Sequence, residues 1–228
     1  MTATAVIPVK GLGNAKRRLA TRLWSDERAR LVLRLLAREL DVLGSVDSID
    51  RIIVVTSDER VKSLAEMKGA LVTLQPDNGV NAAIEAGIAV AFGSGAETVA
   101  ALHGDLPFIH AADVEALIQA SETGVFVIAP DRKRIGTNAI VVRRTGPIGL
   151  RFGVGSFALH LAAARLAELS VREVERDGLG FDLDTPGDLI EYRRRRRCWN
   201  AVEYASETHR IIDRAPGYAG ELSGRDLP

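Results

Sequence analysis

The stretch Val99-Ala100-Ala101-Leu102-His103-Gly104-Asp105-Leu106-Pro107 decides our interpretation of the fold. Its apolar run is too short for a helix and ends abruptly before a proline, so it predicts a buried strand. Strands that are covered on both faces are nearly continuous in small apolar residues. Because ligands of open α/β sheets bind at the carboxyl ends of strands, Asp105 stands where a metal-bound phosphate would lie. The alternative is that Asp105 caps the helix beginning near Ala111 or forms a turn before Pro107.

Composition excludes several classes of protein. The 228 residues are 46% hydrophobic but only 5% aromatic, so aliphatic side chains must fill a sizeable core. Thirty basic and thirty acidic residues cancel, which argues against a nucleic-acid or membrane-surface partner. The single cysteine, Cys198, excludes an internal disulfide, and no run approaches the roughly 18 apolar residues of a membrane span. The N-terminus does not resemble a signal peptide, so we expect a cytoplasmic protein.

Short apolar segments alternate with amphipathic ones along most of the chain. We expect strands over residues 3–9, 51–56, 70–74, 99–103, 125–129, 138–142 and 171–174. Helices are expected over residues 26–43, with Ser25 as N-cap, and over 58–68, 82–92, 113–121, 157–169 and from Pro186 onward. Short connections predict right-handed crossovers and a mostly parallel sheet. We expect one α/β domain over residues 1–197, then a helix (201–212) and a loosely attached tail within residues 198–228.

A basic loop follows the first strand. Lys10, Lys16 and Arg18 flank the glycines of Gly11-Leu12-Gly13-Asn14. Glycine lets backbone N–H groups approach a phosphate closely and the cations add positive charge, so this loop is a candidate phosphate site. It matches neither a Walker loop nor the dinucleotide fingerprint, and a solvated basic loop is the alternative.

Two later segments that contain glycine precede helices. Asn81 follows Gly79 by two residues and can either cap a helix or hydrogen-bond the edge of a base. The segment Phe152-Gly153-Val154-Gly155-Ser156-Phe157 would expose N–H donors at the positive end of a helix, which suits a phosphate or a carboxylate. A simple serine N-cap at Ser156 is the alternative.

Carboxylates alternate before the last expected helix, in Phe181-Asp182-Leu183-Asp184-Thr185-Pro186. On a strand, Asp182 and Asp184 would share one face, and two like charges so close favour a bound cation. A helix entry with Asp184 or Thr185 as N-cap is the other explanation, and both can hold together. The run Arg193–Arg197 is expected to form a solvated helix end, with a subunit contact or a distant phosphate as alternatives.

Taken in order from Val6 to about Leu189, these motifs resemble the 2-phospholactate guanylyltransferases of coenzyme F-420 biosynthesis. The motifs that carry the resemblance are Pro8-Val9-Lys10, Ala15-Lys16-Arg17-Arg18-Leu19, Gly79-Val80-Asn81-Ala82-Ala83, Gly104-Asp105-Leu106-Pro107, Gly136-Thr137-Asn138-Ala139, Phe152-Gly153-Val154-Gly155-Ser156-Phe157 and Leu183-Asp184-Thr185-Pro186-Gly187-Asp188-Leu189. Gly-Asp-Leu-Pro occurs across the wider nucleotidyltransferase superfamily, whereas the Gly-Thr-Asn and Phe-Gly-x-Gly-Ser pair is more specific. The sequence departs from the family pattern at Gly11, where relatives often carry proline, at His103, and after Arg197.

The resemblance implies a single Rossmann-like nucleotidyltransferase domain, with a mostly parallel mixed sheet flanked by helices. It implies an enzyme that transfers GMP from GTP to the phosphate of a three-carbon phospho-acid and releases pyrophosphate. Family members use 2-phospho-L-lactate, phosphoenolpyruvate or 3-phospho-D-glycerate. The sequence does not choose among these acids, and it leaves a homodimer open.

Each motif then receives a role as a hypothesis. Mg²⁺ would be held by Asp105 and Asp184, with Asp182 as an alternative ligand. The triphosphate and the departing pyrophosphate would be neutralised by Lys10, Lys16 and Arg18. Guanine and ribose would be held by Gly79 and Asn81, helped by Thr56 or Asp58. The phosphate or carboxylate of the acceptor would be bound by Thr137, Gly153 and Ser156.

Two other functions stay open at this point. One is another nucleotidyltransferase of the same fold, such as a molybdopterin guanylyltransferase or a sugar-phosphate cytidylyltransferase. The other is a nucleotide-binding protein without catalytic activity. The presence of both Asp105 and Asp184 together with the basic loop argues against the second.

Overall fold

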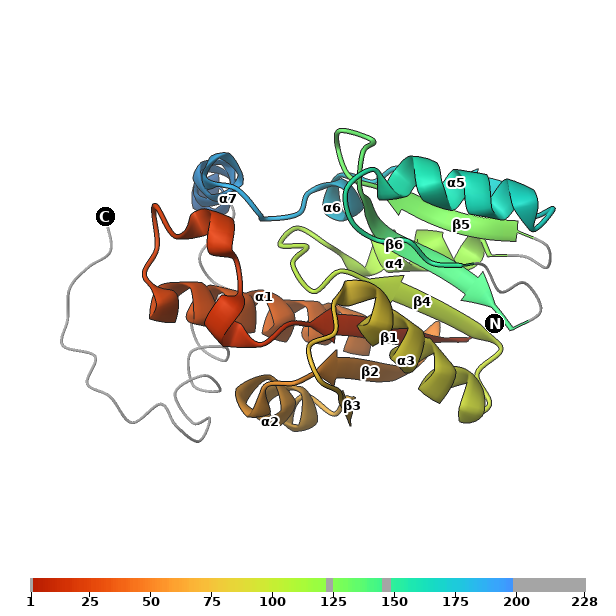
Figure 1. Ribbon diagram of the computed structural model, residues 1–228, viewed down its shortest axis with the longest axis horizontal. Coiled ribbons are helices and arrows are strands. Elements are labelled where there is room, and N and C mark those ends of the chain that lie inside the picture. Colours follow the sequence, from red (N-terminus) through yellow and green to blue (C-terminus); the bar gives the residue numbers. More distant parts are fainter. Residues whose placement is uncertain (1, 122–124, 145–148, 199–228) are drawn as a thin grey trace.

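A seven-stranded mixed sheet forms the centre of the molecule (Figure 1). The computed structural model describes residues 2–121, 125–144 and 149–198. The strands are β1 (Ala3–Val9), β2 (Ile49–Thr56), β3 (Leu71–Leu74), β4 (Thr98–Leu102), β5 (Val125–Pro130), β6 (Thr137–Arg143) and β7 (Ser170–Glu173). They lie in the order β3-β2-β1-β4-β6-β5-β7, and only β6 runs antiparallel to its neighbours among these strands. The expected mostly parallel mixed sheet is therefore confirmed.

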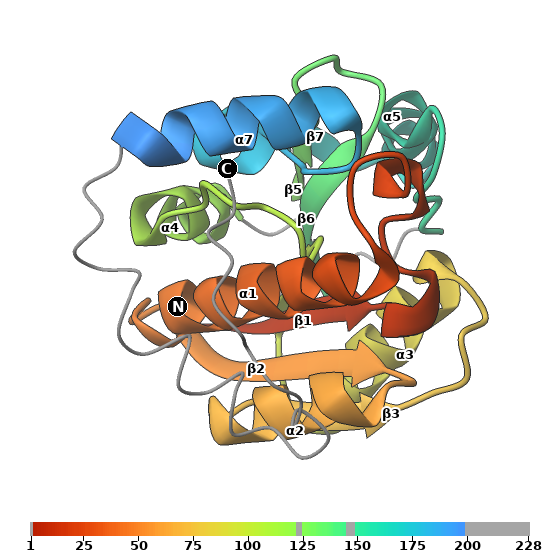
Figure 2. The same cartoon turned by 90° about the vertical axis from the view of Figure 1, so that its left-hand side faces the viewer.

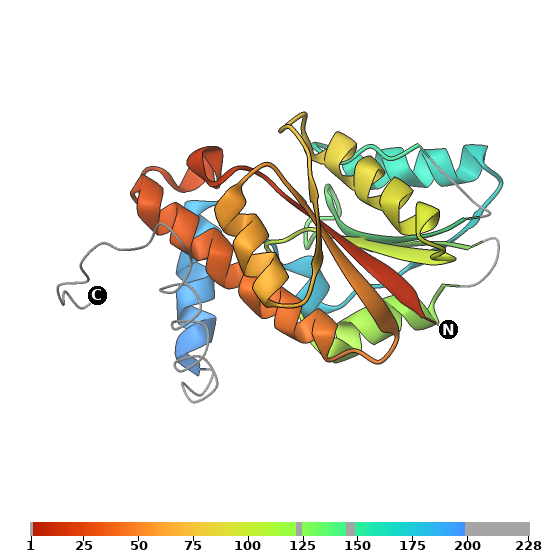
Figure 3. The same cartoon turned by 90° about the horizontal axis from the view of Figure 1, so that it is seen from below.

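Helices cover both faces of this sheet (Figures 2 and 3). One face carries α1 (Ser25–Gly44), α2 (Glu59–Met67) and α4 (Ala111–Gln119), and the other carries α3 (Val80–Gly93) and α5 (Ser156–Leu166). The remaining helical elements are the 3₁₀ turns η1 (Leu12–Asn14) and η2 (Arg17–Leu19), α6 (Asp177–Gly180) and α7 (Pro186–Cys198). Every helix in the described ranges is too short or too polar to cross a lipid bilayer.

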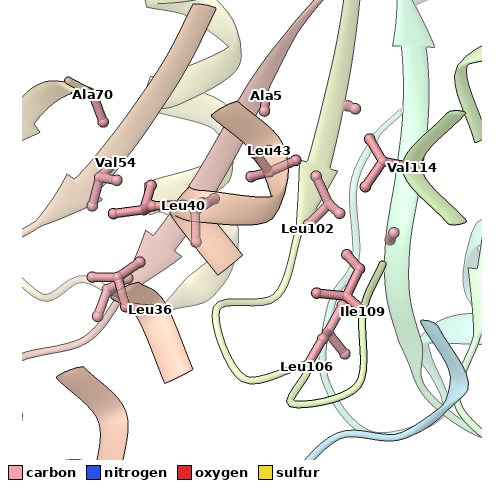
Figure 4. Close-up of a cluster of buried hydrophobic side chains, with 14 of the residues drawn as sticks. Ala5, Leu36, Leu40, Leu43, Val54, Ala70, Leu102, Leu106, Ile109 and Val114 are labelled. Atoms are coloured by element: carbon pink, nitrogen blue, oxygen red, sulfur yellow. The ribbon is translucent and has the colours of Figure 1, made fainter. Parts of the chain in front are cut away.

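The two-sided burial explains why the central strands β1 and β4, and β5, contain almost no polar residues. Successive side chains of a strand point to opposite faces. In β1, Ala5 and Ile7 therefore pack with the α1 side, whereas Val6 packs with the α3 side. Figure 4 shows the α1 side, where Leu36, Leu40 and other aliphatic side chains of α1 meet the sheet.

The start of α1 differs by one residue from the expectation. Ser25 is the first helical residue rather than the N-cap, and Trp24 occupies the N-cap position. The backbone N–H of Trp24 donates to the carboxylate of Glu27 at 2.6 Å. A glutamate three residues into the helix thus binds the N-terminal backbone, and the serine hydroxyl is not required for this.

Two expectations about the aspartates are settled by the local structure. Asp105 does not cap α4, because the N–H of His110 at the start of that helix donates to Asp113 at 3.0 Å. Residues 181–185 form no strand, so the expected alternation of Asp182 and Asp184 on one face of a strand is wrong.

The arginine run lies on α7, and one of its members is anchored. Arg195 lies over the rings of Phe108 and Phe181 and forms ion pairs with Asp177 and Glu191, both at 2.7 Å. Arg193, Arg194 and Arg196 are exposed, as expected for a helix end. The expected helix 201–212 and the tail lie outside the described residues.

Gly87 sets how closely α3 approaches the sheet, which gives a test of the fold. A Cβ atom there would lie 2.4 Å from Cγ1 of Val6 and 3.0 Å from Cγ2 of Val55. We expect Gly87→Ala to lower the free energy of unfolding by about 1–3 kcal/mol, although alanine favours helix, because α3 must move away from the sheet. Urea unfolding measures this change.

Gly93, at the end of the same helix, supplies the matched control. Within the described structure, a Cβ atom at Gly93 would meet nothing within 4 Å beyond its own helix. Gly93→Ala should be neutral or stabilise the protein by up to about 1 kcal/mol. Equal effects of the two substitutions would contradict the proposed close approach at Gly87.

Candidate active site

Loops from distant parts of the chain meet at one edge of the sheet. The parallel strands β1, β2 and β4 all end there, which brings together the segments after Val9, Thr56 and Leu102. The antiparallel strand β6 begins at the same edge. The N–H of His103 donates to the carbonyl of Asn138 at 2.9 Å, so the start of β6 lies directly beside the Asp105 loop.

Lys16 lies at the centre of this edge, between two aspartates. Its backbone is left-handed, with φ of 48°, and its side chain is only 8% exposed. The ammonium Nζ donates to Asp105 and, at 2.7 Å, to Asp184. Burial opposes the charge on Lys16, but the two carboxylates overcome this effect and raise its pKa to about 12.

A backbone contact explains how Asp184 reaches Asp105 from 79 positions further along the chain. The N–H of Leu183 donates to the carbonyl of Asp105 at 3.2 Å, so the irregular segment 181–185 lies along the Asp105 loop. Asp182 belongs to the same group of charges. Burial, together with the nearby carboxylates Asp105 and Asp184, raises the pKa of Asp182 to about 6.

The donor groups of this arrangement fit a magnesium ion. Carboxylate oxygens are the ligands that Mg²⁺ prefers, and Oδ1 of Asp105 is buried without a hydrogen-bond partner in the described structure. No group of three or more acidic, histidine or cysteine side chains able to hold a metal occurs among the described residues. Phosphates and water would therefore complete the coordination.

A cleft of about 610 Å³ opens over these charges. That volume is typical of a site for a small-molecule substrate. Its walls include residues from both halves of the sheet edge, among them Lys10, Lys16, Arg17, Arg18, Thr56, Gln75, Gly79, His103, Asp105, Thr137, Gly153, Ser156, Asp182 and Asp184.

Two residues that we expected at the nucleotide have other partners. The side chain of Asn81 donates to the carbonyl of Phe152 at 3.1 Å and accepts the N–H of the same residue at 2.7 Å. Asp58 caps α2 and accepts the N–H of Leu12 at 3.0 Å. Asn81 therefore holds the segment before Gly153 against α3, and Asp58 holds the basic loop.

The three residues expected at the acceptor acid, Thr137, Gly153 and Ser156, all line the cleft. Gly153 and Gly155 have positive φ angles of 129° and 72°, which glycine adopts without strain. Gly155 is the N-cap of α5, so Ser156 is the first helical residue. The N–H groups of Ser156 and Phe157 donate to carbonyls of the protein, so this helix start offers fewer free N–H donors than the sequence predicts.

Gln75 is a cleft residue that the sequence motifs did not single out. Its Oε1 is buried and has no hydrogen-bond partner within the described residues, while Nε2 donates to the carbonyl of Ala82 at 3.3 Å. Gln75 directly follows β3. This position in the sequence could have indicated that Gln75 lies in the cleft, since the residues after β1 and β2 lie at the same sheet edge.

Comparison with known proteins shows the family of this chain. The family model described as "Guanylyl transferase CofC like" matches residues 3–204. The chain belongs to this family of guanylyl transferases. The family expected from the motifs and the expected enzyme class, a nucleotidyltransferase, are thereby confirmed.

Individual relatives of this guanylyl transferase family differ in name. A phosphoenolpyruvate guanylyltransferase from Sphaerobacter thermophilus is 44% identical over 191 residues, which covers 84% of this chain and 92% of the relative. A 3-phospho-D-glycerate guanylyltransferase from Phenylobacterium zucineum is 37% identical over 196 residues, covering 84% and 90%. Among solved structures, a nucleotidyl transferase from Methanothermobacter has a TM-score of 0.60 at 17% identity, covering 85% and 97%, so it supports the fold.

The charge balance at Lys16 gives a stability test. Lys16→Met leaves Asp105 and Asp184 close together without their shared counter-charge. We expect the free energy of unfolding at pH 7 to fall by about 2–4 kcal/mol, because one partner of a buried ion pair is removed. Millimolar Mg²⁺ should recover part of this loss, measured as a rise in the melting temperature.

Arg18→Met is the control for this experiment. Its side chain is 71% exposed and its guanidinium lies 4.0 Å from Asp184, so its loss should cost well under 1 kcal/mol. Equal losses in the two variants, or no loss for Lys16→Met, would show that Lys16 does not compensate the aspartates.

Proposed function

We propose that this enzyme transfers GMP from GTP to the phosphate of a three-carbon phospho-acid and releases pyrophosphate, as a step of coenzyme F-420 biosynthesis. The observation that carries the proposal is the single cleft that joins a basic loop, the pair Asp105 and Asp184, and a separate acceptor wall. Two anionic substrates and one line of attack require such a shared site. The names of the curated relatives support the same reaction class.

Phosphoenolpyruvate is the acceptor that we expect first. The relatives at 44% and 42% identity carry that name, and a relative at 37% carries the name of 3-phospho-D-glycerate. The third candidate is 2-phospho-L-lactate. Each of these acids presents one phosphate and one carboxylate, so the same hydrogen-bond donors in the cleft would suit all three.

The reaction needs no strong base, because the acceptor phosphate is already an anion at neutral pH. One of its oxygens attacks the α-phosphorus of GTP, and a new P–O–P bond forms. The bond between the α-phosphorus and the bridging oxygen breaks, and its electron pair leaves with pyrophosphate. The work of the protein is to align two anions and to disperse their charge.

The positions of the side chains divide this work. Lys10, Lys16 and Arg18 lie on the basic loop, where they neutralise the triphosphate and the departing pyrophosphate. Mg²⁺, held by Asp105 and Asp184 with Asp182 nearby, would supply positive charge to the reacting phosphates. Lys16 contacts both aspartates, so it also holds these two carboxylates in place.

The remaining walls of the cleft suit the base and the acceptor. Thr56 and Gly79 line the half next to β2 and β3, and Gln75 offers an acceptor oxygen there for the N–H groups of guanine. Thr137, Gly153 and Ser156 line the other half and would bind the acid. GTP and these acids are intracellular metabolites, so we keep the expectation of a cytoplasmic enzyme, and a homodimer stays a prediction.

A product analysis tests the proposed reaction directly. The purified enzyme, Mg²⁺ and GTP are incubated with each of the three acids, and products are identified by mass spectrometry. We expect a guanylylated acid and equimolar pyrophosphate, with phosphoenolpyruvate reacting fastest. CTP and UTP in parallel reactions should give little product. Turnover with CTP, or GTP binding without turnover on any acid, would contradict the proposal.

Substitution of Asp105 tests whether its carboxylate takes part in catalysis. Asp105→Asn keeps the shape of the side chain but halves the negative charge that faces Lys16. We expect kcat for pyrophosphate release to fall about 100-fold or more, with an unchanged circular dichroism spectrum. The control is Asp41→Asn, which removes an exposed carboxylate paired with Lys68. Full activity of Asp105→Asn would remove Asp105 from the catalytic machinery.

A further inference from the structure

A buried histidine lies behind the acceptor wall, outside the set of residues assigned above. His160 lies on α5 and is 0% exposed. Its ring packs edge-on against Phe152, with 4.8 Å between ring centroids. Both of its ring nitrogens have polar partners, one from a strand and one from a loop.

The two hydrogen bonds together determine where the ring carries its proton. The backbone N–H of Arg151 donates to Nε2 at 3.0 Å, so Nε2 is an acceptor and carries no proton. Burial, with a contribution from His103, lowers the pKa of His160 to about 4, so the ring is neutral at pH 7. A neutral imidazole with a bare Nε2 must carry its proton on Nδ1.

The proton on Nδ1 then determines the direction of the next hydrogen bond. Nδ1 lies 3.0 Å from Oγ1 of Thr137, and it must be the donor of this pair. The threonine hydroxyl accepts, so its own proton points elsewhere. No other hydrogen-bond partner of this hydroxyl occurs among the described residues, and Thr137 lines the cleft.

From these contacts we propose that His160 is a positioning residue. By donating to the hydroxyl of Thr137, it orients that hydroxyl so that its proton is donated to an anionic oxygen of the acceptor acid. The inference rests on the proposed function for the identity of that anion. Lone pairs facing the cleft would repel a phosphate or a carboxylate, whereas an O–H donor binds it. The same ring also fixes the segment that leads to Gly153, since it accepts the N–H of Arg151.

Two substitutions separate the two ring nitrogens. The amide nitrogen of asparagine lies as many bonds from Cα as Nδ1, so His160→Asn keeps a donor toward Thr137. The amide oxygen of glutamine lies near the position of Nε2, so His160→Gln keeps an acceptor for Arg151 but has no donor toward Thr137. Both variants remove the same ring from the core, so their difference compares loss of the donor toward Thr137 with loss of the acceptor for Arg151.

We expect His160→Gln to raise KM for phosphoenolpyruvate about tenfold or more while KM for GTP stays within twofold. His160→Asn should keep KM for phosphoenolpyruvate within about threefold of the wild type. Thr137→Val should match His160→Gln, and the double variant should be no worse than either single one, because both remove the same hydrogen bond. A normal KM in His160→Gln, or equal effects of Gln and Asn, would overturn the proposal.

Nitrogen-15 NMR of the imidazole tests the inference without turnover. In the folded wild-type enzyme at pH 7, we expect a protonated Nδ1 and a bare Nε2 for His160. A proton on Nε2 overturns the proposal, whatever acid the enzyme uses. If wild-type enzyme turned over none of the three acids, the proposed function would fail, while this measurement would still decide the orientation of Thr137.

Discussion

The contact of one buried ammonium with two carboxylates organises this enzyme. Lys16, Asp105 and Asp184 come from three separate segments, and each segment is irregular at the point of contact. A buried charge is costly unless it is paired, so loss of the contact with either aspartate would leave the buried ammonium of Lys16 with less compensation. The same contact that holds the loops together concentrates charge in the cleft, where the proposed reaction would bring two phosphorylated substrates together.

The mixed sheet explains how so many loops reach this contact. Parallel strands deliver their carboxyl ends to one edge, which accounts for the basic loop, Thr56 and Asp105. An all-parallel sheet would bring only the carboxyl ends of its strands to that edge. Because β6 runs the other way, Thr137 at its beginning also arrives there, and α5 follows on the same side.

The sequence could predict a site residue when neighbouring residues determine its position, but not when a contact with a distant part of the chain determines it. Asp105 could be located because a continuous apolar run predicts a buried strand, and the end of such a strand has a known place. Asp184 could be identified as a candidate, but its own segment does not determine its position. That position depends on the N–H of Leu183, which donates to a carbonyl 78 positions earlier. The contact of Asn81 could not be predicted for the same reason, because its partner, Phe152, is 71 positions away. The antiparallel direction of β6 follows from the short turn at residues 131–136, where Asp131 accepts the N–H groups of Lys133 and Ile135.

The reversed strand has a consequence for how such an enzyme can change its chemistry. Under the proposed function, the residues that would bind the acid lie between positions 137 and 156, whereas those that would bind the nucleotide come from the first 105 residues, apart from the aspartates near 184. Specificity for the nucleotide and specificity for the acid would then depend on separate segments of the sequence. Substitutions within residues 137–156 alone would then change the acid that is used and leave the nucleotide-binding residues unchanged.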